Sequence, residues 1–459
     1  MNFAAASKKK NILLVIAIMF AVCSVLLFAA DDVFGAKKLS WDQYEVSKDG
    51  KTVYIDPDDY EGDTIQDRQD NAGEALIVAL RDIQTGNGDA KNANTIIIQG
   101  DICVDEGQYQ SNWNPTVASM SVTMKGDGKP TIWVETYHNY FLRGYHSDIT
   151  LENLVIDGSG NTRLVQGGCL YGEDAKFTLK NVTIQNFTKL GEYDDGQSAP
   201  DGYGDRGEGI YGGAAVMLFT ESFSGSTEDY TPWSSFKMDE NSKIINCYSK
   251  MSDVSGNHYE PGAIGGAVYL EGIAQNYPMT VELNGEIDGG NGSAVYAKWC
   301  DISMGNKAYI HDAYGEYGGA MQLSGSGLTM NGSKIANCEA TYGGALYIDA
   351  GEQRNSIDAN HPSDLETKII HLNSGTIQNC TATKDGGAVY ADKYKMKAGS
   401  VHDKENVMYD EYGYDPIDYS GDYPYITFGD MNLYNNSAEY GGAIYNNKSY
   451  IEIKGGTLS

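Results

Sequence analysis

The sequence predicts an all-β fold, a right-handed parallel β-helix that begins with an N-terminal amphipathic capping helix. Three observations lead to this prediction. A Gly-Gly-Ala segment recurs through the second half of the chain, short strand-like segments broken by Gly, Asn or Asp fill most of the rest, and one amphipathic helical pattern precedes them. Self-similarity at a short period is the signature of a solenoid.

The recurring segments set the period of the predicted solenoid. Six copies contain Gly-Gly-Ala and a seventh has Gly-Ser-Ala; they begin at Gly212, Gly265, Gly292, Gly318, Gly343, Gly386 and Gly441. Their spacings are 53, 27, 26, 25, 43 and 55 residues, so three neighbouring intervals agree on a period near 26. Three strand sides of about 8 to 9 residues account for such a coil. Propeller blades need about 40 to 45 residues and do not fit the short intervals.

The first residues have the layout of an export signal. Lys8, Lys9 and Lys10 precede an apolar run from Ile12 to Ala30. This run is also long enough to span a bilayer, so a cleaved signal peptide and an uncleaved anchor both remain open for residues 1–36. We expect the protein to be secreted or held at the cell surface, and to touch a membrane only through this segment.

Residues 37–94 combine a polar segment with the predicted capping helix. Apolar residues recur at three- and four-residue steps over Asn71 to Gln84, and Gly86 follows. A helix here would cover the core and the strand edge of the first coil. Residues 95–459 form the predicted β-helix with its long insertions. The chain stops partway through a coil, so we expect this coil end to be continued or covered by a partner.

An asparagine column is predicted at one turn of the coils. Aligning the repeats on Gly-Gly-Ala places one Asn in each copy, and stacked coils repeat about every 4.8 Å. Asparagine tolerates left-handed backbone and satisfies turn groups with its side chain. The members of this structural column are Asn186, Asn246, Asn337, Asn379 and Asn435.

The paired glycines also have a structural explanation. Two residues without Cβ allow a tight corner, and the following Ala begins a strand where little space is available. Structural pairs of this kind are Gly343 and Gly344, Gly386 and Gly387, and Gly441 and Gly442. Tyrosines follow in period, and the sequence leaves open which face they line: Tyr269, Tyr296, Tyr347, Tyr390 and Tyr445.

This repeat, Gly-Gly-Ala-apolar-Tyr preceded by apolar-x-x-Asn-x-Ala, resembles that of chlamydial polymorphic outer membrane proteins and of adhesin-like surface proteins of other bacteria and archaea. The resemblance implies a pectin-lyase-like β-helix on the cell surface that mediates adhesion, and it implies no catalytic residue. Leu433-x-x-Asn436 matches the family's Phe-x-x-Asn with Leu for Phe. Cys338 and Cys380 replace the Asn in two other copies.

Those two cysteines occupy equivalent positions in successive predicted coils. A Cα separation near 4.8 Å would fit a disulfide, and export would permit oxidation. Two reduced thiols would pack equally well in a column of small residues. Both interpretations remain open, and we favour packing.

The net charge of −30 limits the partners of the chain. An acidic surface repels phosphate backbones, so we expect no nucleic-acid partner, while cation binding remains compatible. One acidic loop could bind Ca²⁺, the one cofactor that we consider. Its candidate ligands are Asp194, Asp195, Asp201, Asp205 and Glu208.

The insertions between repeats are the predicted recognition surface, for a host surface protein or a glycan. They cover residues 189–208, 220–235, 249–262, 351–366 and 393–424. The candidate binding residues, in the last insertion, are Tyr409, Tyr412, Tyr414, Tyr419 and Tyr423. The alternative function is a β-helical lyase or glycoside hydrolase that acts on acidic polysaccharide, although no catalytic residue is predicted.

Overall fold

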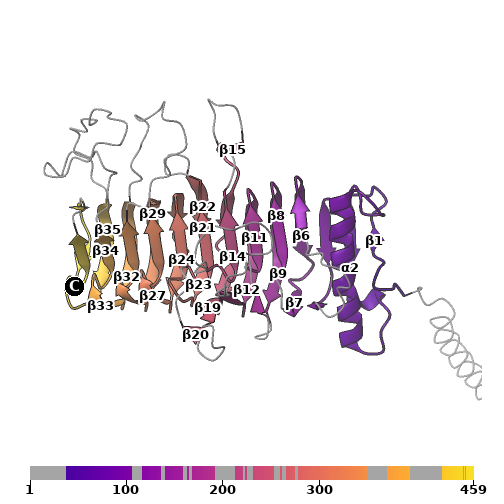
Figure 1. Cartoon of the computed structure of the whole chain (residues 1–459), viewed down its shortest axis with the longest axis horizontal. Helices are drawn as coiled ribbons and strands as arrows, with labels where there is room; N and C mark the ends of the chain where they lie inside the picture. Colours follow the sequence, from indigo (N-terminus) through magenta and orange to yellow (C-terminus); the bar gives the residue numbers. More distant parts are fainter. Residues whose placement is uncertain are drawn as a thin grey trace, which may run out of the picture. The chain divides into compact units, whose positions relative to one another are not determined.

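The structure is a computed structural model. It describes residues 38–105, 116–135, 140–158, 163–164, 168–191, 212–220, 223–224, 231–252, 259–260, 265–273, 278–349, 370–392, 426–447, 449 and 451–459. The chain divides into units 1–40 and 41–459, and the elements described below belong to the second unit. The fold is mostly β, with long parallel sheets that are compatible with a solenoid (Figure 1).

The largest sheet, the main sheet, has 19 strands within the described residues. They are β1 (Glu45–Val46), β2 (Thr52–Ile55), β3 (Thr95–Ile98), β4 (Ile102–Asp105), β6 (Ser121–Gly126), β7 (Thr131–Glu135), β9 (Asp148–Asp157), β12 (Lys176–Gln185), β17 (Ser235–Met238), β18 (Lys243–Ile245), β22 (Met279–Leu283), β23 (Glu286–Asp288), β25 (Cys300–Met304), β26 (Tyr309–His311), β29 (Gly327–Ala336), β32 (Ile370–Gln378), β35 (Ile426–Tyr434), β37 (Ile451–Ile453) and β38 (Thr457–Leu458). All its pairings are parallel except that of β1 with β2.

A second sheet has 10 parallel strands in the same described part of the chain. They are β5 (Thr116–Ala118), β8 (Leu142–Tyr145), β11 (Leu170–Glu173), β14 (Val216–Phe219), β21 (Val268–Glu271), β24 (Val295–Lys298), β28 (Met321–Ser324), β31 (Leu346–Asp349), β34 (Val389–Asp392) and β36 (Ile444–Asn447). Each strand pairs in register with the next, so equivalent residues of successive repeats lie side by side.

Three smaller sheets complete the described strands. The third sheet contains β27 (Tyr314–Tyr317), β30 (Glu339–Tyr342) and β33 (Thr381–Asp385). The fourth contains β10 (Arg163–Leu164), β13 (Thr188–Gly191), β19 (Tyr248–Ser252) and β20 (Tyr259–Glu260), and a short antiparallel pair contains β15 (Phe223–Ser224) and β16 (Thr231–Pro232). One regular repeat therefore contributes β25 and β26 to the main sheet, β27 to the third sheet and β28 to the second sheet.

Two strands are longer than the sequence predicts. The polarity breaks in the sequence predict separate strands over 149–151 and 154–156, and over 177–179 and 182–184, but β9 and β12 each run through both segments. Asn153 and Asn181 lie between the segments, with φ of 53° and 54°. A single left-handed residue bends a strand without ending its pairing, so a polarity break in the sequence resembles a turn.

The helix α2 (Ile65–Thr85) begins before the expected Asn71. Thr64 caps its first turn by accepting from the Asp67 backbone amide, and the Asp67 carboxylate accepts from the Thr64 amide. The short 3₁₀ helix η1 (Pro57–Asp59) precedes it, and Gly86 ends it in the left-handed region, as predicted. The helix packs against β4, where a Cβ on Gly73 would lie 1.7 Å from the Cys103 carbonyl oxygen.

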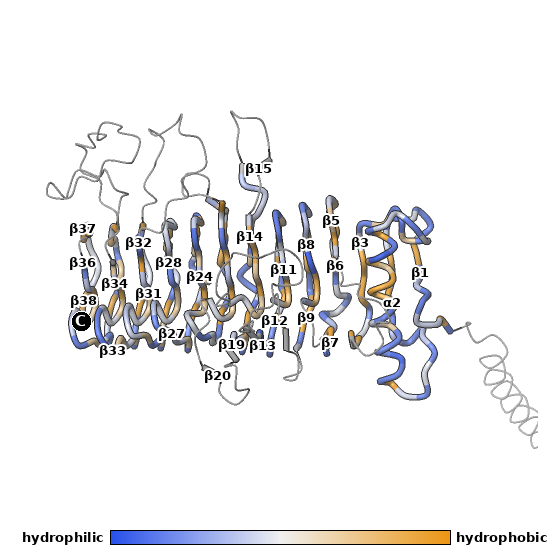
Figure 2. Tube along the Cα trace, viewed as in Figure 1, coloured by the Kyte–Doolittle hydropathy of each residue, from blue (hydrophilic) through white to orange (hydrophobic). Residues whose placement is uncertain are grey.

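Columns of apolar residues form the core. Ile287, Ile310, Ile335, Ile377 and Leu433 occupy equivalent positions in successive main-sheet strands and are buried. Apolar residues recur in strand after strand of Figure 2. Side chains of a strand alternate between its faces, so the neighbours of these residues project outward.

The first Gly-Gly-Ala copy is shifted by one residue from the predicted alignment. The amide of Gly213 donates to the Gly265 carbonyl, and that of Ala214 donates to the Gly266 carbonyl. Gly213, Ala214 and Ala215 are thus the equivalents of Gly265, Gly266 and Ala267. The Gly-Gly-Ala pattern begins at Gly212, and only strand pairing shows that Gly213 is the structural equivalent of Gly265.

Candidate functional site

The candidate residues chosen from sequence lie in the insertions, outside the described residues. This holds for the binding tyrosines Tyr409, Tyr412, Tyr414, Tyr419 and Tyr423. It holds also for the predicted metal ligands Asp194, Asp195, Asp201, Asp205 and Glu208. The described residues show where the insertions are attached and which side chains lie beside them.

Two long insertions share one attachment, whereas residues 192–215 connect β13 of the fourth sheet to β14 of the second sheet. Residues 350–369 connect β31 of the second sheet to β32 of the main sheet, and residues 393–425 connect β34 to β35 in the same way. In regular repeats Trp299 alone connects β24 to β25. Pairing stays in register across the insertions, since Leu346 pairs with Val389. These two insertions, residues 350–369 and 393–425, therefore begin and end at the same corner of successive repeats.

Two predicted recognition segments begin inside a sheet and not in loops. Lys189 and Ser249, at the start of 189–208 and 249–262, are paired neighbours in β13 and β19 of the fourth sheet. Both are buried. The Lys189 ammonium donates to the Gly212 carbonyl at 2.9 Å and contacts the Met217 sulfur at 3.0 Å. Their charge and polarity resemble those of loop residues, so the sequence did not reveal this burial.

The asparagine column lies at the end of the main-sheet strands. All five members have left-handed backbone, with φ between 52° and 62°. Asn379 Nδ2 donates to Asn337 Oδ1 at 3.1 Å, and Asn435 Nδ2 donates to Asn379 Oδ1 at 3.4 Å. Between Asn246 and Asn337 the column passes through Gly289 and Asp312, which have φ of 86° and 54°.

The periodic tyrosines lie on the outer face of the second sheet. In β31, Leu346 and Ile348 point into the core, so Tyr347 between them points outward. The rings of Tyr347 and Tyr390 stack with centroids 5.3 Å apart, and Tyr390 stacks on Tyr445 at 5.2 Å. Tyr347 lies three residues before residue 350, where the insertion begins, so this tyrosine ladder borders the insertion corner.

Rings from the third sheet cover part of this ladder. Tyr317 and Tyr342 stack at 5.7 Å, and each meets a ladder ring edge to face: Tyr317 meets Tyr347 at 4.8 Å, and Tyr342 meets Tyr390 at 5.5 Å. Tyr347 is 7 % exposed and Tyr390 is 8 % exposed. The faces of these rings are occupied by other rings, so they are not available for stacking on a ligand.

Cys338 and Cys380 are both buried free thiols. They follow Asn337 and Asn379 in adjacent repeats, and the Thr381 amide donates to the Cys338 carbonyl at 2.9 Å. A hydrogen bond from Cys338 to the Cys380 sulfur, together with burial, raises the pKa of the Cys338 thiol. The structure thus has the packed arrangement of this pair.

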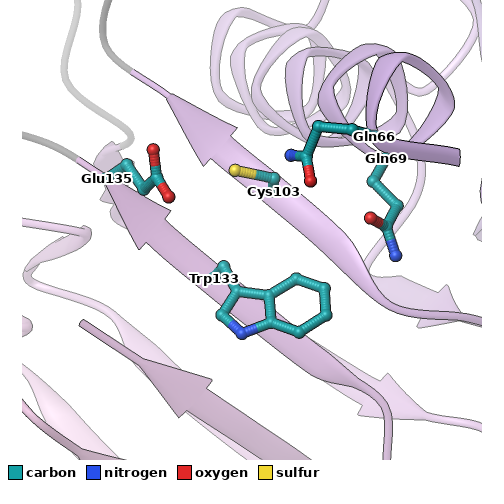
Figure 3. Close-up of a pocket in the computed structure, with 5 residues that line it drawn as sticks. All are labelled: Gln66, Gln69, Cys103, Trp133 and Glu135. Carbon is teal, nitrogen blue, oxygen red and sulfur yellow. The ribbon is translucent and has the colours of Figure 1, made fainter. Parts of the chain in front are cut away.

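A shallow cavity of about 210 Å³ lies between the helix and the first repeats (Figure 3). Gln66 and Gln69 reach it from α2, Cys103 from β4, and Trp133 and Glu135 from β7. Two amides, an indole and a carboxylate can hydrogen-bond and stack on a hydroxylated ligand. Sequence reasoning missed this set because it comes from three separate elements.

A histidine between carboxylates is a further candidate that sequence reasoning missed. His311 ends β26, Asp312 follows it, and Asp288 ends the adjacent β23. The donor atoms of these three side chains lie within 4.8 Å of one another. The repeat alignment carried a signal, since His311 and Asp312 stand where the next copy has Ala336 and Asn337.

Comparisons with known proteins found no match: no protein-family model, no curated protein and no solved structure matches this chain. Among the residues that the structure describes, no helix has the length and apolar character needed to cross a membrane. The apolar run of residues 12–30 lies outside them.

Proposed function

We propose that residues 95–459 form a right-handed parallel β-helix. Parallel strands that pair in register from repeat to repeat support this proposal. Connections between parallel strands of one sheet are right-handed in about 98 % of cases, which supports the hand. A crystal structure of the exported region tests it, and a left-handed path between β25 and β29 would contradict it.

We further propose that the chain is an exported, adhesin-like surface protein that binds a host surface protein or a glycan. The observation that carries this proposal is the corner shared by residues 350–369 and 393–425. A rigid, repetitive frame presents these two long segments from equivalent positions, which is how recognition loops are arranged on a scaffold. The tyrosine ladder borders this corner.

The experiment compares three forms of the chain for binding to host cells and to immobilised glycans. In the first form a Gly-Ser linker of equal length replaces residues 404–423, which removes the predicted tyrosines. In the second, the matched control, the same kind of linker replaces residues 107–114 between β4 and β5. We expect binding to fall at least tenfold in the first form only. Unchanged binding in the first form would contradict the proposal.

The third form, Trp133→Ala, separates two places of contact. If glycan binding depends on Trp133 and not on residues 404–423, the cavity is the binding site and the insertion corner is not.

The alternative enzymatic function is tested on the same protein. Pectin, alginate or chondroitin is incubated with the chain and CaCl₂. Absorbance at about 235 nm reports the conjugated uronate that lyase chemistry would produce. We expect no change in absorbance. A steady increase would replace the adhesion proposal by a lyase.

A further inference from the structure

We propose that Asp288, His311 and Asp312 form a binding site for a divalent transition-metal cation such as Zn²⁺ or Mn²⁺. This site is distinct from the acidic insertion predicted from sequence and does not depend on the adhesion proposal.

Strand pairing brings the first two ligands together. Asp288 and His311 are direct neighbours across β23 and β26, and the core residues Ile287 and Ile310 before them fix the faces on which they lie. Both side chains therefore project from the outer face of the main sheet. The rigid parallel ladder holds the carboxylate and the imidazole next to each other before any cation binds.

The turn after β26 supplies the third ligand. Asp312 has left-handed backbone with φ of 54°, which brings its carboxylate back toward the ring of the preceding residue. Asp312 Oδ2 lies 2.5 Å from His311 Nδ1, and Asp288 Oδ1 lies 3.5 Å from the same nitrogen. Asn337 Nδ2 donates to the other oxygen, Asp312 Oδ1, at 3.2 Å and orients the carboxylate.

The other ring nitrogen is held by a different carboxylate. His311 Nε2 lies 3.1 Å from Glu286 Oε1, and the second oxygen of Glu286 lies 2.5 Å from the Lys243 ammonium. A hydrogen on Nε2 is donated to the Glu286 carboxylate, which only accepts hydrogen bonds. In that tautomer the Nδ1 lone pair faces two carboxylates. A carboxylate on the opposite ring nitrogen is the usual support of a metal-bound histidine.

Three acceptors therefore converge on one point, and a cation is required between them. Either a second proton on the imidazole or a metal ion satisfies this requirement. One imidazole nitrogen with two carboxylate oxygens suits Zn²⁺ or Mn²⁺ better than Ca²⁺, which takes oxygen ligands. Zinc bonds of about 2.0 to 2.2 Å require only that Asp312 Oδ2 move about 1 Å away from the nitrogen.

The site combines a rigid ring with open access. His311 is 10 % exposed as a side chain and stacks on the Tyr309 ring at 4.1 Å, and Lys334 lies over the same tyrosine at 4.7 Å. Asp288 and Asp312 are 36 % and 52 % exposed, so a hydrated cation can reach them from solvent. Tyr248 also lies near both carboxylates, and burial raises the pKa of its hydroxyl.

The experiment measures metal binding to the full chain, purified in mild detergent because of its apolar N-terminal run. ZnCl₂ or MnCl₂ is titrated by calorimetry at pH 7.5, and bound metal is counted after dialysis. The variant Asp312→Asn places in the column the residue found at Asn337 and Asn379, so it retains the left-handed turn. His311→Gln removes the nitrogen ligand. Asp301→Asn, on an exposed carboxylate of β25, is the matched control.

We expect the parent chain and Asp301→Asn to bind one more equivalent of Zn²⁺ than Asp312→Asn and His311→Gln, or to bind it at least tenfold more tightly. Equal binding by all four proteins would overturn the proposal. Displacement of the bound Zn²⁺ by an equal concentration of CaCl₂ would also overturn it, because it would exclude the nitrogen ligand. Far-ultraviolet circular dichroism checks that each variant is folded.

Discussion

Asn379 stacks on Asn337 in the next repeat, with its amide nitrogen 3.1 Å from the Asn337 side-chain oxygen and both residues in left-handed backbone. The backbone amide of Asn337 in turn donates to the Gln378 carbonyl at 3.1 Å. One residue type therefore satisfies two requirements of the turn, a positive φ and a side-chain hydrogen bond along the stack.

Replacing Asn379 separates these two requirements. We expect Asn379→Ala to lower the free energy of unfolding by about 2 kcal/mol, about 1 for the left-handed backbone and about 1 for the lost hydrogen bond. Asn379→Gly keeps the backbone freedom and should cost about 1 kcal/mol. Urea unfolding followed by tyrosine fluorescence measures both variants. Equal losses would show that the backbone conformation contributes nothing.

The second glycine of the repeat is required by close packing. A Cβ on Gly344 would lie 2.2 Å from the Gly387 carbonyl oxygen of the next repeat. We expect Gly344→Ala to lower the free energy of unfolding by about 3 kcal/mol, because the contacting Gly387 oxygen belongs to the backbone and cannot move aside. Gly86→Ala, at a left-handed position where nothing lies within 4 Å of the added Cβ, is the control and should cost about 1 kcal/mol. Similar losses in thermal unfolding would argue against the packing explanation.

The repeat pattern predicted much of the fold because one physical constraint acts on every copy. Apolar columns such as Ile335 and Ile377, and turn residues such as Asn337, must recur if coils stack in register. The pattern aligned the first copy on Gly212, one residue before Gly213, the true equivalent of Gly265. It also predicted two strands where β9 is a single bent strand. Only the pairing of strands distinguishes these alternatives.

The candidate sites were harder to predict from sequence than the fold. The metal site depends on Asp288 standing beside His311, which are separated in sequence and adjacent only through the register of β23 and β26. The sequence placed Lys189 in a loop because a lysine is usually exposed. Its burial depends on Gly212 and Met217, which come from other segments of the chain. The predicted binding tyrosines lie outside the described residues, so that prediction stands as made.

The tyrosine ladder provides a test of stacking between repeats. Tyr347 and Tyr390 are stacked at an interplanar angle of 5°. A double-mutant cycle with Tyr347→Leu and Tyr390→Leu should give a coupling energy of about 0.5 to 1.5 kcal/mol in favour of the pair. The matched cycle combines Tyr347→Leu with Tyr54→Leu in β2, which is distant in the stack, and should be additive. Additive losses for the stacked pair would contradict a stacking contribution.

The buried Lys189 makes stability depend on pH. Burial lowers the pKa of Lys189 to about 7, whereas an unfolded lysine has a pKa near ~10.4. Between these values the unfolded chain holds a proton that the folded chain lacks, so this residue makes the free energy of unfolding rise as pH increases from about 7 to about 10.

Lys189→Met removes the titratable amine and keeps an unbranched side chain. We expect the variant to be more stable than the parent at pH 7, by about 2 kcal/mol or more, and the difference to shrink toward pH 10 as the parent lysine of the unfolded chain loses its proton. Lys307→Met, at an exposed lysine, is the control and should leave the pH profile unchanged. Urea unfolding at about pH 6, 7, 8, 9 and 10 measures the free energy of unfolding of all three proteins. A difference between Lys189→Met and the parent that stays constant with pH would mean that Lys189 is charged in the folded protein and is paired there.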